Sequence, residues 1–285
     1  MLDQLDALRA LHDTRTMGKA AARLRITQSA VSKRIAALEA EVGFPLLERD
    51  GRRVRLTTAG LRLLDDVGPL LRELKARVAA AAGDARVRVR LGASESLLSS
   101  WLPAALRAAS PPDVDVEIHA HRGRWVIERL RAGELDLAIV VGSGEEGLEA
   151  RALGTEPMVL VPSGLAPFTP AAGERVTVWT IEAGSLTGAW LARRLPRREL
   201  PWSLELGERI ESFSAAVQLA RAGFGHALVP VGVARAAGVE VFLPIPGIER
   251  PIVLMARPSA WERAGLRRFA DAVMTVGVPA VGVPG

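Results

Sequence analysis

The sequence predicts an α/β protein that begins with a small, mostly helical domain followed by a long helix. Residues 1–57 hold short amphipathic helical patterns and end in a basic, turn-rich stretch. Residues 58–85 hold one long helical pattern, which ends at the stop signal Ala82-Gly83-Asp84. Residues 86–285 alternate short β-branched runs with amphipathic helices, as parallel α/β folds do. These three zones are the predicted domains.

The composition is that of a globular protein with ample apolar material for its cores. Hydrophobic residues make up 49% of the chain and charged residues 24%. No run approaches the roughly 18–20 apolar residues of a membrane span, and the N-terminus lacks the basic segment of a signal peptide. The absence of cysteine excludes disulfides, thiolate catalysis and cysteine-ligated zinc. We therefore expect a cytoplasmic protein without membrane association.

Positive charge is concentrated near the N-terminus. The segment from Arg15 to Arg55 contains ten basic and four acidic residues, a net charge of +6, whereas the whole chain carries +5. The remainder therefore nets about −1. A basic patch confined to one small domain is typical of a surface that binds phosphate backbones. The alternative is a face that serves only solubility.

The spacing of apolar residues predicts three short helices in the first zone. Leucines recur at helical spacing from residue 2 to residue 11, and residues 17–24 form an alanine-rich second helix. Thr27 is a good N-cap for a third helix over residues 28–41. The apolar residues of the third helix line one buried face: Val31, Ile35, Leu38 and Val42.

The other face of the third helix begins with polar and basic side chains. Residues at the start of the second helix of a helix-turn-helix contact base edges in the major groove. Glutamine suits adenine, serine is adaptable, and lysine reaches guanine or phosphate. The candidate DNA-binding residues of this helix are Gln28, Ser29, Ser32, Lys33 and the adjacent Arg34.

A hairpin follows the third helix. Asp50-Gly51 lies between two extended runs, which is a strong hairpin signal. Arg52 and Arg53 at its tip suit the narrow, electronegative minor groove. A plain surface hairpin is the alternative, but the position directly after a basic helix-turn-helix favours a DNA-binding wing.

The stretch AAARLRITQSAVSKRIAALEAEVGFPLLERDGRRVRLTTAG resembles the winged helix-turn-helix of the LysR-type transcriptional regulators. The match runs over some forty residues and includes the TQSAVS core, the ALE segment and the LT-x-x-G that opens the next helix. The resemblance implies DNA contacts by Gln28, Ser29, Ser32 and Lys33, and by Arg53 of the wing. Many members have proline at Ser29 and arginine at Lys33. Because lysine lacks the bidentate fork of arginine, base preference at Lys33 is expected to be softer.

The long helix carries an apolar seam at spacings of three and four residues, over about two heptads. The seam either packs on its own domain or pairs two protomers. A helix that leads away from a small domain has little else to bury against, which favours dimerisation. The resemblance implies the same pairing, commonly within tetramers. The candidate dimerisation residues are Leu64, Val67, Leu71, Leu74 and Val78.

Hydroxyl side chains follow several predicted strands of the third zone. Loops and helix N-termini at the carboxyl edge of a parallel sheet bind ligands, because free backbone N–H groups point outward there. The hydroxyls are candidate hydrogen-bond donors to a small anion or amino acid; the alternative is that each only caps a helix. They are Ser94, Ser96, Ser185, Thr187 and Ser212.

The third zone resembles the effector-binding domain of the same family, a two-lobed fold like that of periplasmic binding proteins. The resemblance rests on VRLGASESLLSSWLPAAL, ERLRAGELDLAIV and VQLARAGFGHALVP. It implies lobe one over about residues 86–155 and 256–285, lobe two over about 156–255, and a small-molecule effector between them. It adds Gly142 and Phe224 to the candidate hydroxyls. Arg122 follows a strand, where it either pairs with an effector carboxylate or is solvated.

No motif supports an enzyme or a cofactor. The chain lacks a phosphate-binding glycine loop, a dinucleotide-binding glycine motif after a strand and a nucleophile elbow. His119 and His121 share one strand face, but no third metal ligand is evident. We therefore predict neither an enzyme nor a metal site.

The predicted function is that of a homo-oligomeric transcriptional regulator that responds to an effector. Its expected partners are double-stranded DNA, a small-molecule effector, further copies of itself and RNA polymerase. A solute-binding protein is the first alternative, but it predicts a signal peptide and no basic N-terminal domain. An architectural DNA binder without sequence preference is the second, and competitor DNA distinguishes it.

Overall fold

The computed structural model describes residues 1–50, 53–81, 86–195 and 200–279. The chain divides into two compact units, Met1–Ala85 and Arg86–Gly285, which are treated separately below. Among the described residues, no helix is both long enough and apolar enough to cross a membrane.

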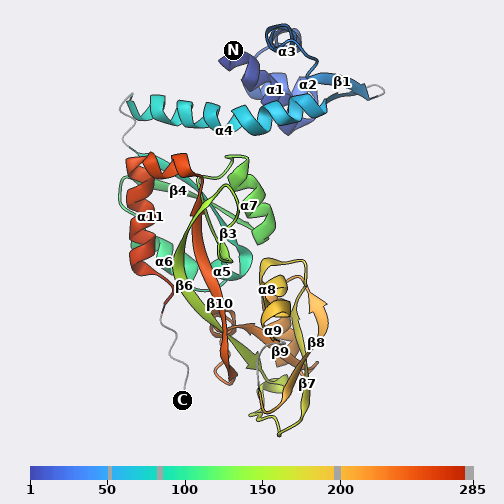
Figure 1. Ribbon diagram of the computed structural model, residues 1–285, viewed down its shortest axis with the longest axis vertical. Coiled ribbons are helices and arrows are strands. Elements are labelled where there is room, and N and C mark those ends of the chain that lie inside the picture. Colours follow the sequence, from blue (N-terminus) through green and yellow to red (C-terminus); the bar gives the residue numbers. More distant parts are fainter. Residues whose placement is uncertain (51–52, 82–85, 196–199, 280–285) are drawn as a thin grey trace. The chain divides into compact units, whose positions relative to one another are not determined.

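The N-terminal unit is a helix-turn-helix with a two-stranded hairpin and a long final helix (Figure 1). The side-chain oxygens of Thr16 and Thr27 accept hydrogen bonds from backbone N–H groups in the first turns of the second and third helices. The elements are α1 (Leu2–Thr14), α2 (Met17–Leu24), α3 (Gln28–Val42), β1 (Leu47–Asp50), β2 (Arg53–Leu56) and α4 (Thr58–Ala81).

The predicted buried face of α3 is confirmed. Val31, Ile35 and Leu38 are buried, and Val42 packs against the same core at partial burial. The core also contains apolar residues of α1 and α2, so the three helices pack together. Glu39 of α3 fixes the start of the hairpin, because its carboxylate accepts hydrogen bonds from two successive backbone N–H groups, at Leu46 (2.7 Å) and Leu47 (3.0 Å).

The predicted dimerisation seam of α4 divides into two parts. Leu71 is buried, and Leu64 and Val67 are partly buried, against the core of the same unit. For Leu71 the dimerisation prediction needs correction, because its own domain buries it, whereas Leu64 and Val67 are only partly covered and their role in dimerisation stays a prediction. Leu74 and Val78, nearer the end of the helix, are exposed.

The C-terminal unit contains one eight-stranded sheet in the order β4-β3-β5-β10-β6-β9-β7-β8. Strands β3, β4 and β5 are parallel, and so are β7, β8 and β9. The long strands β6 and β10 pair antiparallel and join the two parallel sets (Figure 1). The strands are β3 (Val87–Ser94), β4 (Val114–His121), β5 (Leu137–Val141), β6 (Glu149–Val161), β7 (Arg175–Ile181), β8 (Ser203–Ile210), β9 (His226–Pro230) and β10 (Leu243–Ala256).

Helices cover the sheet and divide the unit into two lobes, each with its own apolar core. In lobe one, residues of α6 and α11 pack on one side of the sheet and residues of α7 on the other (Figure 1). The helices are α5 (Glu95–Leu98), α6 (Leu102–Ala109), α7 (Gly123–Arg131), α8 (Leu186–Arg194), α9 (Phe213–Arg221), α10 (Val231–Ala236) and α11 (Ala264–Val276), with short 3-10 turns at η1 (Ser163–Leu165) and η3 (Pro258–Glu262).

The chain passes between the lobes twice. On β6, Leu153 packs in the core of lobe one and Met158 in that of lobe two. On β10, Ile248 packs in lobe two and Ile252 in lobe one. The return crossing therefore lies near residue 250, about five residues before the expected boundary at 255.

A buried carboxylate ties β3 to the segment before β5 in lobe one. Asp136 accepts hydrogen bonds from the backbone N–H and the guanidinium of Arg90 and from the guanidinium of Arg263 (2.8 Å). Burial alone would raise the pKa of Asp136, but the bonds and charges of Arg90 and Arg263 hold it below its usual value.

Asp136→Asn should lower the free energy of unfolding of this unit by about 2–3 kcal/mol at neutral pH. A lowered pKa in the folded state adds stability above the unfolded pKa of about 4, and that stability disappears as the pH falls through the folded pKa. The difference between wild type and variant should therefore shrink below about pH 4. Urea unfolding at several pH values measures it, with the exposed Asp115→Asn as the matched control. Equal losses in both variants would contradict the role of Asp136.

Candidate functional site

The start of α3 forms an exposed polar surface on the N-terminal unit. Gln28, Ser29, Ser32 and Lys33 are all exposed, on the side of the helix away from its buried face. The hydroxyl of Ser29 lies 3.0 Å from that of Thr27, the N-cap residue. The sequence therefore brings four of the predicted DNA-contacting side chains together at one helix start.

The other predicted DNA-contacting residues are not part of this exposed helix start. Arg34 is turned toward α1, where its guanidinium donates to the carboxylate of Asp3 at 2.9 Å, so it is not part of the free polar surface. Arg52 lies outside the described residues, and so does the side chain of Arg53. A basic residue that the prediction omitted, Arg55, pairs with Glu48 across the hairpin at 2.8 Å.

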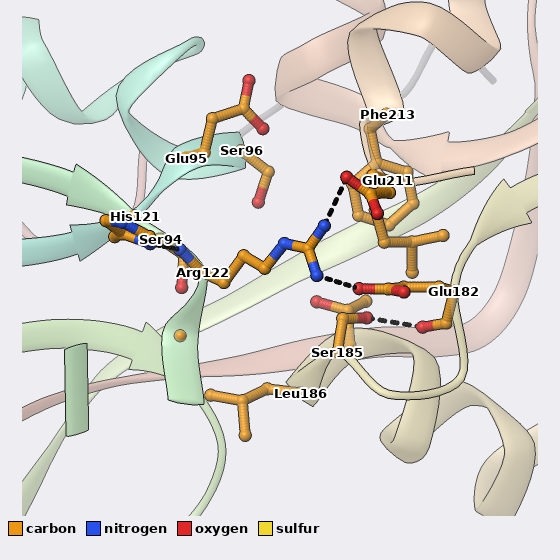
Figure 2. A pocket seen from close by; sticks show the side chains of 13 residues that line it. Ser94, Glu95, Ser96, His121, Arg122, Glu182, Ser185, Leu186, Glu211 and Phe213 are labelled. Atoms are coloured by element: carbon orange, nitrogen blue, oxygen red, sulfur yellow. Dashed lines mark hydrogen bonds and ion pairs between the residues drawn. The ribbon is translucent and has the colours of Figure 1, made fainter. Parts of the chain in front are cut away.

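A second candidate site is a cavity between the lobes of the C-terminal unit (Figure 2). It lies at the carboxyl ends of β3 and β4 from lobe one and of β7 and β8 from lobe two. The cavity encloses about 450 Å³, including open solvent at its mouth. Five of the predicted ligand-binding residues line it: Ser94, Ser96, Arg122, Ser185 and Thr187.

Three other predicted residues do not line the cavity. Gly142 follows β5, and its N–H donates to the carbonyl of Pro251 on β10. Phe224 is 69% exposed, and its carbonyl accepts a hydrogen bond from the indole of Trp179. Ser212 makes no side-chain cap bond, and its neighbours on both sides line the cavity in its place. Successive side chains of an extended segment point to opposite sides, which explains why the neighbours of Ser212 line the cavity and Ser212 does not.

A fully buried ion pair lies where the chain crosses between the lobes. Arg250 of β10 and Glu156 of β6 are partners in the strand register, and both side chains have no exposed surface. Both Nε and Nη2 of Arg250 donate to one oxygen of Glu156, at 2.9 and 2.6 Å. The other oxygen of Glu156 accepts from the N–H of Gly232 in lobe two at 3.1 Å.

The same arginine reaches two residues of the cavity wall. Nη1 of Arg250 donates to the hydroxyl of Ser96 from lobe one at 2.9 Å and to that of Thr187 from lobe two at 3.4 Å. Ser96 and Thr187 are both buried. The ion pair therefore connects the two lobes and orients two of the cavity's hydroxyls from behind.

An exposed ion-pair cluster crosses the mouth of the cavity. Arg122 extends from the end of β4 toward Glu182 and Glu211 on the other lobe (Figure 2). Its guanidinium lies 2.9 Å from the carboxylate of Glu182 and also pairs with Glu211. Pairing with Glu211 and the charge of Glu182 raise the pKa of Arg122, and Arg122 in turn lowers the pKa of Glu211. These two carboxylates of lobe two hold the Arg122 guanidinium in place.

Two further residues complete the lobe-one wall. The carboxylate of Glu95, at the start of α5, makes no hydrogen bond or ion pair with another described residue, and partial burial raises the pKa of this carboxyl. The ring of His121 stacks on Trp125 with a centroid distance of 4.0 Å. In the described part of the chain, no group of three or more histidine or carboxylate side chains could hold a metal ion.

The sequence prediction missed every carboxylate of the cavity. Glu182 follows β7 directly and Glu211 follows β8 directly, and the two strands are parallel neighbours that pair at their last residues. An acidic residue immediately after each of two adjacent strands was therefore a usable signal. Arg250 gave no such signal, because its partner Glu156 lies 94 residues earlier in the chain.

Models of two protein domains match nearly the whole chain. "Bacterial regulatory helix-turn-helix protein, lysR family" matches residues 2–61, and "LysR substrate binding domain" matches residues 82–277. An uncharacterized HTH-type transcriptional regulator from Vibrio cholerae is 26% identical, with 96% of this chain and 95% of that protein covered. A probable hydrogen peroxide-inducible genes activator from Mycobacterium avium is 30% identical over 94% of this chain and 92% of that protein. The fold resembles that of a full-length OxyR variant from Pseudomonas aeruginosa, with a TM-score of 0.74, 20% identity and coverage of 97% and 96%.

Proposed function

The chain belongs to the LysR family of bacterial transcriptional regulators, and on that premise we propose that α3 reads DNA and the interlobe cavity binds the effector. The protein is a DNA-binding transcriptional regulator with an effector-binding domain, not an enzyme. The observation that carries the DNA-reading proposal is the exposed polar start of α3, which its buried face holds rigidly on the helical core.

The residues proposed to read bases are Gln28, Ser29, Ser32 and Lys33, because all four side chains are exposed on the surface. Arg52 and Arg53 of the wing remain proposed minor-groove contacts on the ground of the sequence. The pairing of Arg34 with Asp3 gives it a positioning role, in which it holds the start of α1 against α3.

Selection from a random DNA library tests this proposal. Two copies of α3 in a dimer present their reading faces to half-sites one or more DNA turns apart. The full-length protein should therefore enrich a pseudo-palindromic sequence with that spacing. A pool that stays random after repeated rounds, while still bound, would identify a DNA binder without sequence preference.

The effector site is proposed to be the interlobe cavity, with Ser94, Ser96, Arg122, Ser185 and Thr187 among its contacts. The side chains come from both lobes, so a ligand bound among them changes the free energy of one lobe arrangement relative to another. Such a shift alters the spacing between the DNA-binding units of an oligomer, and we propose that the effector changes DNA binding in this way. Ser185 also caps α8, since its hydroxyl oxygen accepts the N–H of Gly188 at 2.9 Å.

LysR regulators are oligomeric, and we propose that the outer part of α4 pairs two protomers as a homodimer, with a homotetramer as the larger assembly. Leu74 and Val78 lie one helical turn apart and are exposed, as is Leu70 one turn earlier. An exposed apolar ridge of this kind is typical of a helix that packs on a second copy.

Leu74→Lys combined with Val78→Lys should shift the protein from dimer toward monomer at micromolar concentration. The reason is that two apolar side chains of each protomer, which the proposed dimer interface buries, are replaced by charged ones. Sedimentation velocity measures the change. Leu61→Lys, on a different face of the same helix, is the matched control and should leave the assembly intact. A double variant that remains as oligomeric as wild type would exclude this ridge as the interface.

We further propose that the protein acts in the cytoplasm, where a bacterial regulator meets the chromosome, and that RNA polymerase is a partner at the regulated promoter. Both proposals follow from the regulatory function. A pull-down of RNA polymerase on promoter DNA, with and without the regulator, tests the second of them.

A further inference from the structure

The charges on the cavity wall are unbalanced. Three carboxylates line the cavity, those of Glu95, Glu182 and Glu211, and the arginine among the lining residues is Arg122. The three carboxylates and the one guanidinium together carry a net formal charge of −2. Arg250 behind the wall adds no positive charge, because Glu156 neutralises it within the same buried ion pair. A cavity wall with this excess attracts cations and repels anions.

Two of the carboxylates already hold an organic cation. Glu182 and Glu211 follow adjacent parallel strands of lobe two, and the guanidinium of Arg122 from lobe one lies between them (Figure 2). The pair is accessible to solvent, since half of the Arg122 side chain and about three quarters of the Glu211 side chain are exposed. Exposed ion pairs of this kind are weak and exchange readily with ions from solution.

The third carboxylate has no partner of its own. Glu95 lies on the opposite lobe wall and makes no ion pair with any described residue. Glu95 is exposed, so a second cationic group, or the far end of a long cation held by the other two acids, has access to its carboxylate. The cavity thus offers acids on both lobes and an arginine that can leave its present position.

We propose that the effector is a small organic cation whose ammonium or guanidinium group replaces that of Arg122 between Glu182 and Glu211. This inference rests on the proposed function of the cavity as the effector site. Arg122 then acts as an internal competitor: it holds the two lobes together when the effector is absent and lowers the apparent affinity for the effector.

Titration of the full-length protein with defined probes tests the proposal. The cationic probes are L-arginine, L-lysine and agmatine, and the anionic probes are L-glutamate and succinate. Calorimetry should show saturable binding of at least one cationic probe and none of the anionic probes. Binding of the anions alone, or of no probe, would overturn the proposal.

Matched variants test the exchange itself. Arg122→Met should tighten binding of the cationic probe about tenfold because the internal competitor is gone. Glu182→Gln and Glu211→Gln should each weaken it by about tenfold or more. The controls are Arg131→Met and Glu128→Gln, both exposed on or near α7 and outside the cavity lining. Weaker binding in Arg122→Met would instead assign Arg122 to the ligand's anchor and contradict the exchange.

Binding to the DNA site selected above, measured on the same preparations without probe, separates the two hypotheses. Retained DNA binding together with anion-only ligand binding refutes the cation class and leaves the regulatory function standing. Saturable cation binding by a protein that binds no DNA preserves the cavity assignment and refutes the DNA-reading proposal.

Discussion

Arg250→Met should lower the free energy of unfolding of the effector-binding domain by about 3–5 kcal/mol, among the largest effects of any substitution considered. The reason is that Glu156, which has no exposed surface, would keep its charge in the interior without a counterion. The hydroxyls of Ser96 and Thr187 would also lose the donor that orients them.

Urea unfolding followed by tryptophan fluorescence measures this effect in the full-length chain, because all six tryptophans lie in residues 86–285. Arg131→Met is the matched control, since its pair with Glu145 is exposed and should contribute about 1 kcal/mol or less. The double variant Arg250→Met, Glu156→Met should regain part of the loss, because it leaves no unpaired buried charge. A loss in Arg250→Met no larger than in the control would show that the ion pair does not stabilise the crossing between the lobes.

Gln28→Ala should weaken binding to the selected DNA site by about 1–3 kcal/mol, roughly 5- to 150-fold. A glutamine amide can donate and accept in one plane, so its loss removes a base-specific contact while the helix and its buried face stay intact. Binding to unrelated DNA should change little, because phosphate contacts dominate that binding.

Fluorescence anisotropy with labelled duplexes gives both affinities. Gln218→Ala is the matched control, because Gln218 is exposed on α9 of the other unit. Lys33→Ala, by comparison, should reduce the slope of log affinity against log salt by about 1 if the lysine contacts a phosphate. Loss of affinity in Gln28→Ala that is equal for specific and unrelated DNA would remove Gln28 from base reading.

The helix-turn-helix was predictable because its determinants are local. The periodicity of Val31, Ile35 and Leu38 fixes which side of α3 is buried, and Thr27 fixes where the helix begins. Once those two facts are set, the exposed positions follow from helix geometry. The pairing of Arg34 with Asp3 was not predictable in this way, since the two residues are 31 positions apart.

The interlobe cavity was only half predictable. Hydroxyls at strand ends pointed to Ser94, Ser96, Ser185 and Thr187, because a parallel sheet gathers its carboxyl ends at one edge. The charged residues of the cavity wall were not predicted, because a single glutamate or arginine in a sequence is most often a solvated surface residue. Only the strand pairing of β6 with β10 reveals that Arg250 and Glu156 neutralise each other inside the protein.

The long helix shows a different limit. A seam of apolar residues indicates that one face of α4 is covered, but the spacing is the same whether the cover is the helix's own domain or a second copy. The packing of Leu71 on the local core and the exposure of Leu74 and Val78 divide the seam at a point that periodicity alone does not mark.

The ratio of affinities for specific and unrelated DNA tests most directly whether α3 reads a specific DNA sequence. The full-length protein is titrated, at physiological salt, with the selected duplex and with a scrambled duplex of equal length and composition. The selected duplex should bind at least about 10³-fold more tightly than the scrambled one. A ratio near one, with both duplexes bound through salt-sensitive contacts alone, would contradict it.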